Sequence, residues 1–148
     1  MDHEINLLAE IATTYPQAAY TAYVTSYQHK MTYFLRTIPG IEKQLEKIDE
    51  VVRHKLIPAI IGGHIINDTE RKMLSLPTRL GGMGIKIFSQ TAETDFKDSS
   101  RITSNLQDQI LGTNENETEK KTKYQIKNER EKRNQEQLKQ FLNMCDEK

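Results

Sequence analysis

The chain has 148 residues, of which 36% are hydrophobic and 28% charged, with 21 basic and 21 acidic side chains. This length allows one modest domain, and the zero net charge gives no overall attraction to nucleic acid or to a membrane surface. The longest apolar run, "LIPAIIGGHII" at 56–66, is too short and too rich in glycine to span a bilayer, and the first residues show no secretory signal. We therefore expect an intracellular protein of the cytoplasm or nucleus, in which a local patch recognises any charged partner.

Amphipathic helices are predicted throughout the first sixty residues. A first helix is expected over "EINLLAEIA" at 4–12, and Pro16 ends it or starts the next. The next helix, over 16–38, carries a stripe of large residues at offsets of three and four: Tyr20, Val24, Tyr27, Met31, Phe34 and Ile38. A third helix is expected over 41–56, and it should kink or stop near Ile57 because Pro58 has no amide hydrogen to donate to residue 54.

Shorter elements are predicted in the middle of the chain. Asn67 can cap a short helix that ends near Leu74, with Glu70 reaching back to complete a capping box. The sequence also allows a brief strand over "GIKIF" at 84–88. Two further helical segments are expected over 92–100 and 102–112, the second ending at a glycine.

The last part of the chain differs in composition from the rest. Residues 114–148 are almost entirely Lys, Glu, Asn, Gln and Arg of alternating charge, and their few apolar residues do not form a heptad pattern. We therefore predict a mostly α-helical fold. It consists of a small bundle over 1–112 with a glycine-rich turn, followed over 113–148 by a long charged helix or a disordered tail that could dock on a partner.

A glycine-rich corner interrupts the helical pattern at "LSLPTRLGGMGIKIF", residues 74–88. Pro77 fixes one backbone dihedral, while Gly81, Gly82 and Gly84 permit positive φ or a close approach of two backbone segments. The corner lacks the lysine and hydroxyl of a nucleotide-binding loop, so a phosphate cradle is the weaker interpretation. A tight turn is the stronger one, and a turn that also touches a sugar-phosphate backbone is a third.

Basic residues are concentrated around this corner. Arg71, Lys72, Arg79 and Lys86 lie within sixteen residues that contain no acidic side chain, which is the strongest local charge excess before the tail. These four residues are the predicted nucleic-acid contacts. A weaker patch joins Lys30 and Arg36 to two aromatic residues, Tyr33 and Phe34, whose rings could stack on bases or pack in the core.

No set of residues predicts catalysis, a metal site or a cofactor. His29, His54 and His64 have no carboxylate or thiol at ligand spacing, and the sole cysteine, Cys145, has no partner for a disulfide. Asp95 and Asp98 share one side of a predicted helix, where a solvated face is the simpler interpretation than a general acid and base. Ser99 and Ser100 do not form a nucleophile elbow and are interpreted as a helix end.

Two stretches resemble a known family. The run "LAEIATTYPQAAYTAYVTSYQHKMTYFLRTIPGIEKQLEKIDEVVRHKLIPAIIGG" and the following "NDTERKMLSLPTRLGGMGI" are similar to the segment downstream of the polymerase palm in reverse-transcriptase-bearing retroelement polyproteins. The resemblance covers residues 7–104, and its most specific part is the "LPxRxGGxGI" signature at 76–85, where Met83 replaces a more common Leu or Ile.

The resemblance implies a thumb or post-thumb region, a helical part that holds primer-template nucleic acid next to an upstream polymerase domain. The chain has no Tyr-x-Asp-Asp turn and no adjacent aspartates, so it lacks the ligands for two-metal catalysis and we do not expect it to polymerise alone. The expected function is therefore non-catalytic nucleic-acid binding by a retroelement fragment. The alternatives are a helical protein-interaction module and a relic without selected activity.

Overall fold

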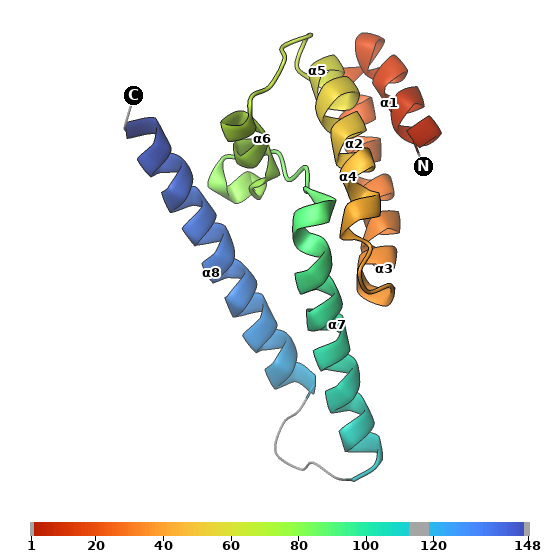
Figure 1. Ribbon diagram of the computed structural model, residues 1–148, viewed down its shortest axis with the longest axis vertical. Helices are drawn as coiled ribbons and strands as arrows, with labels where there is room; N and C mark the ends of the chain where they lie inside the picture. The colour runs from red at the N-terminus through yellow and green to blue at the C-terminus, as the bar shows by residue number, and fades with distance from the viewer. Residues whose placement is uncertain (1, 113–118, 147–148) are drawn as a thin grey trace.

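The computed structural model describes residues 2–112 and 119–146, which fold almost entirely into helices (Figure 1). They include no strand, so the mostly α-helical prediction is confirmed, and the charged C-terminal segment forms a long helix. None of these helices combines the length and the apolar composition needed to cross a bilayer. The α-helices are α1 (Asp2–Thr14), α2 (Pro16–Ala22), α3 (Gln28–Thr37), α4 (Glu42–Val51), α5 (Ile57–Ile60), α6 (Asp68–Ser75), α7 (Phe88–Ile110) and α8 (Glu119–Asp146).

Two of the predicted helices contain a wide π-helical turn. Helices α2 and α3 form one continuous rod through the π turn Tyr23–Tyr27, in which the Gln28 amide donates to the Tyr23 carbonyl. Helices α4 and α5 are joined in the same way through Val52–Leu56. A π turn is an α-helical turn with one additional residue. In both rods the first and last residues of the turn face the core.

Pro58 does not stop the third predicted helix. The rod continues from α4 through the π turn to Ile60, and Pro58 sits in the first turn of α5. In that position a missing amide hydrogen is tolerated, because the π turn has already shifted the hydrogen-bond pattern of the rod. The helix therefore does not stop near Ile57, which was one of the two predicted outcomes, but ends about one turn later, at Ile60.

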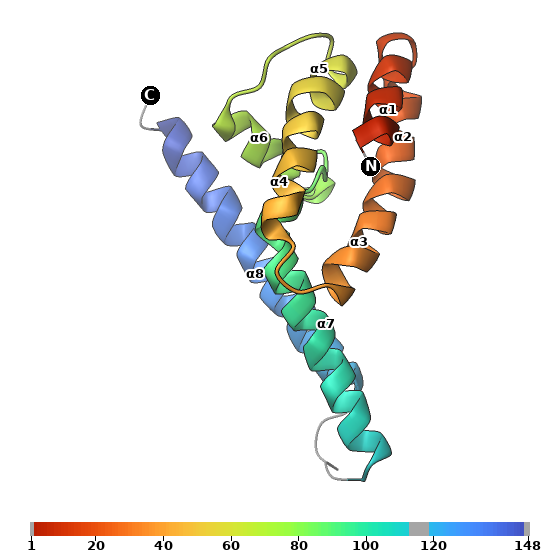
Figure 2. The same cartoon turned by 45° about the vertical axis from the view of Figure 1, so that its right-hand side comes forward.

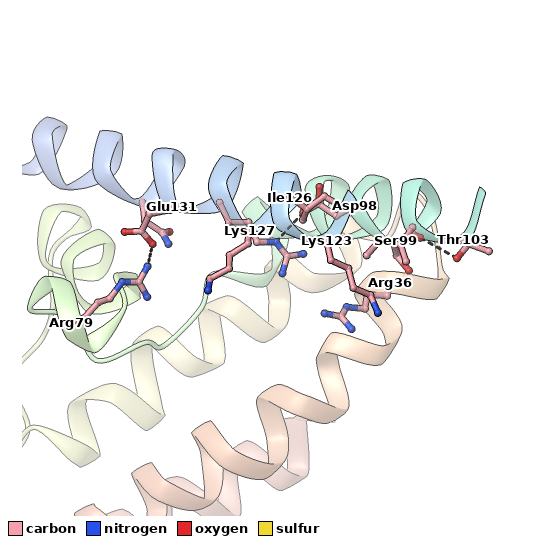
Figure 3. A pocket seen from close by; sticks show the side chains of 12 residues that line it. Arg36, Arg79, Asp98, Ser99, Thr103, Lys123, Ile126, Lys127 and Glu131 are labelled. Atoms are coloured by element: carbon pink, nitrogen blue, oxygen red, sulfur yellow. Dashed lines mark hydrogen bonds and ion pairs between the residues drawn. The ribbon is translucent and has the colours of Figure 1, made fainter. Parts of the chain in front are cut away.

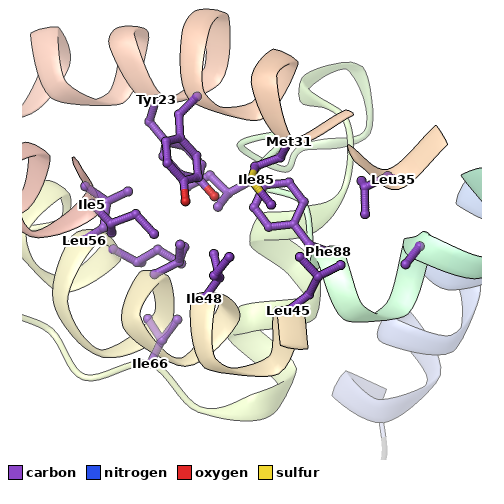
Figure 4. Close-up of a cluster of buried hydrophobic side chains, with 14 residues drawn as sticks. Ile5, Tyr23, Met31, Leu35, Leu45, Ile48, Leu56, Ile66, Ile85 and Phe88 are labelled. Carbon is purple, nitrogen blue, oxygen red and sulfur yellow. The ribbon is translucent and has the colours of Figure 1, made fainter. Parts of the chain in front are cut away.

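One hydrophobic core lies between the two rods, with α1 and the start of α7 closing its ends (Figure 4). Tyr23, Met31 and Leu35 enter it from the first rod, and Leu56 enters from the second; all four are fully buried. Burying one such side chain contributes roughly 1.5–3 kcal/mol. The other members include Ile5, Leu45, Ile48, Ile57, Ile66, Ile85 and Phe88.

Helix α7 is longer than predicted and is capped by another helix. The two segments expected over 92–100 and 102–112 form a single helix from Phe88 to Ile110. Its first turn is capped by Asp49 of α4, whose carboxylate accepts hydrogen bonds from the amides of Phe88 at 2.9 Å and Ser89 at 2.8 Å. An anion in this position satisfies unpaired amides and complements the positive end of the helix dipole. The cap therefore fixes α7 against the second rod.

Helix α8 runs back antiparallel to α7, and its C-terminal part passes α6 (Figure 2). Within the described residues, α8 contributes no side chain to the core between the rods. The predicted boundary after residue 112 follows the end of α7, and residues 113–118 lie outside the described part of the chain. Helix α8 thus lies on the surface of a body formed by the other helices.

Candidate nucleic-acid interface

The glycine-rich corner is a close approach between two backbone segments. The carbonyl of Leu76 accepts the amide of Gly84 at 2.8 Å, and the carbonyl of Leu74 accepts the amides of Met83 and Ile85. A Cβ atom on Gly82 would lie 2.0 Å from the Leu76 carbonyl oxygen, so only glycine fits there. The interpretation of the corner as a tight turn is confirmed, because Gly81 and Gly84 also adopt the left-handed conformation, with φ of 84° and 67°.

Side chains from two helices bind the corner's backbone from the other side. Tyr20 donates its hydroxyl to the Met83 carbonyl at 2.6 Å. The Gln28 amide group donates to the Gly84 carbonyl at 3.1 Å and accepts the amide of Lys86 at 2.8 Å. The predicted strand over 84–88 is therefore absent: side chains, rather than a neighbouring strand, satisfy the polar groups of this extended segment.

Arg71 belongs to this structural network and not to a surface. Its side chain is buried, with 4% of the residue exposed, and its guanidinium donates to the carbonyls of Ile85 at 2.7 Å and Lys86 at 2.9 Å. Burial lowers the pKa of Arg71 from its usual value, although the nearby Tyr23 and Asp49 oppose that effect. A buried guanidinium with two carbonyl partners cannot reach a phosphate. We therefore remove Arg71 from the predicted nucleic-acid contacts.

The other three predicted cations do not gather at one point. Lys72, Lys86 and Arg79 are accessible, but each lines a different hollow along α8. Arg79 alone lies at the largest of these hollows, where it forms an ion pair with Glu131 of α8. The predicted cations therefore do not form one patch. Of the three, only Arg79 lines the hollow that we consider as a binding site.

The hollow at Arg79 is a groove of about 840 Å³ between the end of α3, the middle of α7 and the first half of α8 (Figure 3). We call it the basic groove. Its charged lining comprises two carboxylates, Asp98 and Glu131, and five cations: Arg36, Arg79, Lys123, Lys127 and Arg130. In Figure 3, Lys123 and Lys127 extend from α8 between Arg79 at one end and Arg36 at the other. The groove therefore has a row of positive charge along its length.

Some of these cations already have carboxylate partners. Arg130 pairs with Asp98 at 2.9 Å and with Asp95 at 3.1 Å, and Arg79 pairs with Glu131. By contrast, Arg36 and Lys127 form no ion pair with any carboxylate of the described chain. Both are exposed. The groove therefore presents cations that are free to bind an anion from solution.

Most of this groove was not predicted from the sequence. A signal was present in α8, because Lys123, Lys127 and Arg130 follow at offsets of four and three and therefore share one face of a helix. Arg36 was predicted, but as part of a patch with Lys30, which instead pairs with Glu4 at 2.8 Å. The row of cations was not recognised because basic and acidic residues alternate along the tail, although they can lie on different faces of the helix.

The aromatic residues of that weaker patch have different environments. Phe34 packs against the core, whereas Tyr33 is 66% exposed and touches Phe34 edge-on, with ring centroids 5.7 Å apart. The structure therefore places Phe34 at the core, as one of the two possibilities required, while stacking of Tyr33 on a base stays a prediction. Only Tyr33 is accessible to a ligand.

Helix α8 is held to the body by polar contacts around open space. Besides the pairs of Arg130, the contacts are Arg133 with Asp98 at 3.4 Å and Arg101 with Glu129 at 3.1 Å. Hollows of about 430 and 220 Å³ lie under its second half. Ile126 is its principal buried apolar residue. The contact of α8 therefore depends on charge more than on close packing.

Asp95 and Asp98 act in this contact. Both are buried, so the predicted solvated face is wrong, and their arginine partners give them a structural role in place of acid–base chemistry. Asn67 and Glu70 form the predicted capping box. His64 Nε2 lies 3.1 Å from a carboxylate oxygen of Glu70. Among the described residues, no three side chains of a ligating type gather as a metal site would require.

Comparison of this chain with models of protein families, with curated proteins and with solved structures finds no match.

Proposed function

We propose that this chain is a non-catalytic, nucleic-acid-holding segment of a retroelement reverse-transcriptase polyprotein. The single observation that carries the proposal is the basic groove, in which five cations face two carboxylates. The resemblance of residues 7–104 to the region after the polymerase palm supports the same proposal independently. In this proposal the partners are a primer-template and an upstream polymerase domain, and the protein works in the cytoplasm or nucleus.

The chemistry of the groove suits a phosphate backbone. Phosphates are bound by several separate cations at once, and each contact releases counterions from the nucleic acid, so that affinity falls steeply as salt rises. Arg36 and Lys127 have no carboxylate to displace and would contact phosphates first. Arg79 would contribute after its release from Glu131. Such contacts position a nucleic acid but do not read its sequence.

The test is the salt dependence of binding to a fluorescent primer-template. We expect the double variant Arg36→Gln/Lys127→Gln to bind more weakly and to reduce the slope of log K against log salt by about two, one for each lost contact. The matched control is Lys47→Gln/Lys132→Gln, which removes the same charge from exposed positions outside the groove. An equal loss in both variants, or no binding by the native chain at low salt, would reject the proposal.

A second candidate, a protein-interaction module, is favoured by an apolar stripe that runs along α1 to the residue after it. Leu7, Ile11 and Tyr15 follow at offsets of four, and they are 50%, 40% and 66% exposed. Stripes of this spacing are typical of helices that dock in a groove or on a partner domain. The two candidates differ in what weakens binding. Binding to nucleic acid should weaken as salt rises, whereas an apolar contact with a protein partner should be lost in Ile11→Glu. A relic would show neither.

A further inference from the structure

We infer that the basic groove accepts a single strand, such as a template overhang, and not the double helix beside it. The inference rests on the proposed function and names the form of nucleic acid that enters the site. Two features carry it: the size of the groove, and two exposed tyrosines, Tyr33 and Tyr124, on the helices that supply its cations.

The groove is too small to enclose a duplex. Its volume, about 840 Å³, falls within the range of pockets that enclose small ligands, roughly 300–1,000 Å³. A B-form duplex is so wide that its major groove, about 12 Å across, itself admits an α-helix. A hollow between three helices of one small domain therefore has room for a single strand, while a duplex could only rest against its rim.

The two tyrosines lie close in sequence to cations of the groove, on the same helices. Tyr33 lies three residues before Arg36 on α3, and Tyr124 lies three before Lys127 on α8, so each tyrosine is one helical turn from a groove cation. Both side chains are 66% exposed. Proteins that bind single strands combine a cationic groove with aromatic rings on which successive bases stack. The bases of a duplex are already stacked and paired, so they cannot use these rings.

The contact of Tyr33 with Phe34 favours this role. The edge of one ring meets the face of the other at 76°, and Phe34 is itself packed against the core. The exposed ring of Tyr33 is therefore held from one side and loses little freedom when a base stacks on its open side. No such ring contact is formed by Tyr124 with the described aromatic residues. We accordingly expect Tyr33 to contribute more than Tyr124.

The experiment compares three labelled nucleic acids at one salt concentration: a single strand, a blunt duplex of the same length, and that duplex with an overhang. We expect the single strand and the overhang to bind at least tenfold more tightly than the blunt duplex. Tyr33→Leu should weaken single-strand binding about tenfold and Tyr124→Leu about fivefold, with blunt-duplex binding unchanged. Tyr15→Leu, at an equally exposed position between α1 and α2, is the control and should change nothing.

Competition by inorganic polyphosphate, which has no bases, separates stacking from charge. Its binding should fall in Arg36→Gln and remain unchanged in Tyr33→Leu. The inference is overturned if the blunt duplex binds as tightly as the single strand, or if the two tyrosine variants bind all three nucleic acids as the native chain does. Salt-dependent binding in that case would leave the proposed function standing, whereas no binding of any nucleic acid would reject both.

Discussion

Arg130 of α8 donates from its Nε atom to a carboxylate oxygen of Asp98 on α7, at 2.9 Å, and both residues line the basic groove. Asp98 is buried and also accepts from Arg133, so one carboxylate anchors two arginines of α8. Few apolar side chains support the contact. The position of α8, and with it one wall of the groove, therefore depends on Asp98.

Replacing Asp98 by Asn should loosen α8. The variant keeps the shape of the side chain but leaves Arg130 and Arg133 without its charge. The arginines are 38% and 41% exposed, so water would compensate for part of the loss, and we expect a cost of about 1–2 kcal/mol in the free energy of unfolding. Urea denaturation and the rate of proteolysis within α8 measure the effect. Glu93→Gln, which breaks the exposed pair with Lys97, is the control and should cost almost nothing.

Replacing Glu131 by Gln should strengthen nucleic-acid binding. The change frees Arg79 and removes one negative charge from the groove, so we expect affinity to rise about twofold to fivefold, the worth of an exposed ion pair. Glu136→Gln alters the net charge equally but at a position outside the groove, and it should have a smaller effect. Fluorescence anisotropy at low salt compares them. Equal gains would show that only net charge matters.

Replacing Gly82 by Ala should destabilise the protein severely. The new methyl group would meet the Leu76 carbonyl oxygen at 2.0 Å, and two hydrogen-bonded backbone segments would have to separate, at a cost of about 3 kcal/mol or more. Gly81→Ala is a sensitive comparison, because that site has open space and only its positive φ opposes a side chain, at roughly 1–2 kcal/mol. Thermal unfolding of both variants gives the order. A milder effect at residue 82 would contradict the close approach.

Replacing Tyr23 by Phe should reduce the loss of stability at alkaline pH. Burial raises the pKa of Tyr23; Arg71 opposes this effect, and Asp49 and Tyr27 add to it. In the unfolded chain a tyrosine ionises near pH 10, so above about that pH the unfolded state binds fewer protons than the folded one and stability falls. Phe removes this contribution. Urea titrations at pH 8 and pH 10.5 measure it, with Tyr33→Phe as the exposed control.

The same Tyr23 variant should fold well at neutral pH. Among the described residues, the buried Tyr23 hydroxyl has no hydrogen-bond partner. Removing an unsatisfied polar group from the core is neutral or stabilising by about 1 kcal/mol. A marked loss of stability at pH 7 would instead show that the hydroxyl has a partner.

Apolar periodicity and backbone chemistry were sufficient to predict much of the fold. The stripe over 16–38 predicted the first rod because its large residues, except the exposed Ile38 at its end, pack in or against one core. Asn67 with Glu70 predicted the start of α6 because a capping box is a local structure. Gly82 was predicted to allow a close backbone approach, which the structure confirms. Each of these predictions depends on residues that are near one another in sequence.

Features that depend on distant partners were predicted less well. Helix α7 was divided in two because Ser99 and Ser100 were interpreted as a helix end, whereas the helix continues through them. The structural role of Asp95 and Asp98 was missed because their arginine partners lie more than thirty residues away. Arg71 was counted in the local excess of positive charge, but its side chain is buried. Its partners, backbone carbonyls of the glycine-rich corner, lie about fifteen residues away and could not be identified from local sequence. The groove itself requires α3, α7 and α8 to meet. No local pattern carries that information.

The π turn at Tyr23–Tyr27 sets the rotational phase of everything after it in the first rod. If the same residues wound through this stretch as an ordinary α-helix, the additional residue would no longer be absorbed in the wide turn, and each later side chain would rotate by about 100°. Met31 and Leu35 would turn away from the core, and Arg36 would leave the groove. By absorbing one additional residue, the π turn thus keeps both the interior side chains and the cationic end of the same helix in position.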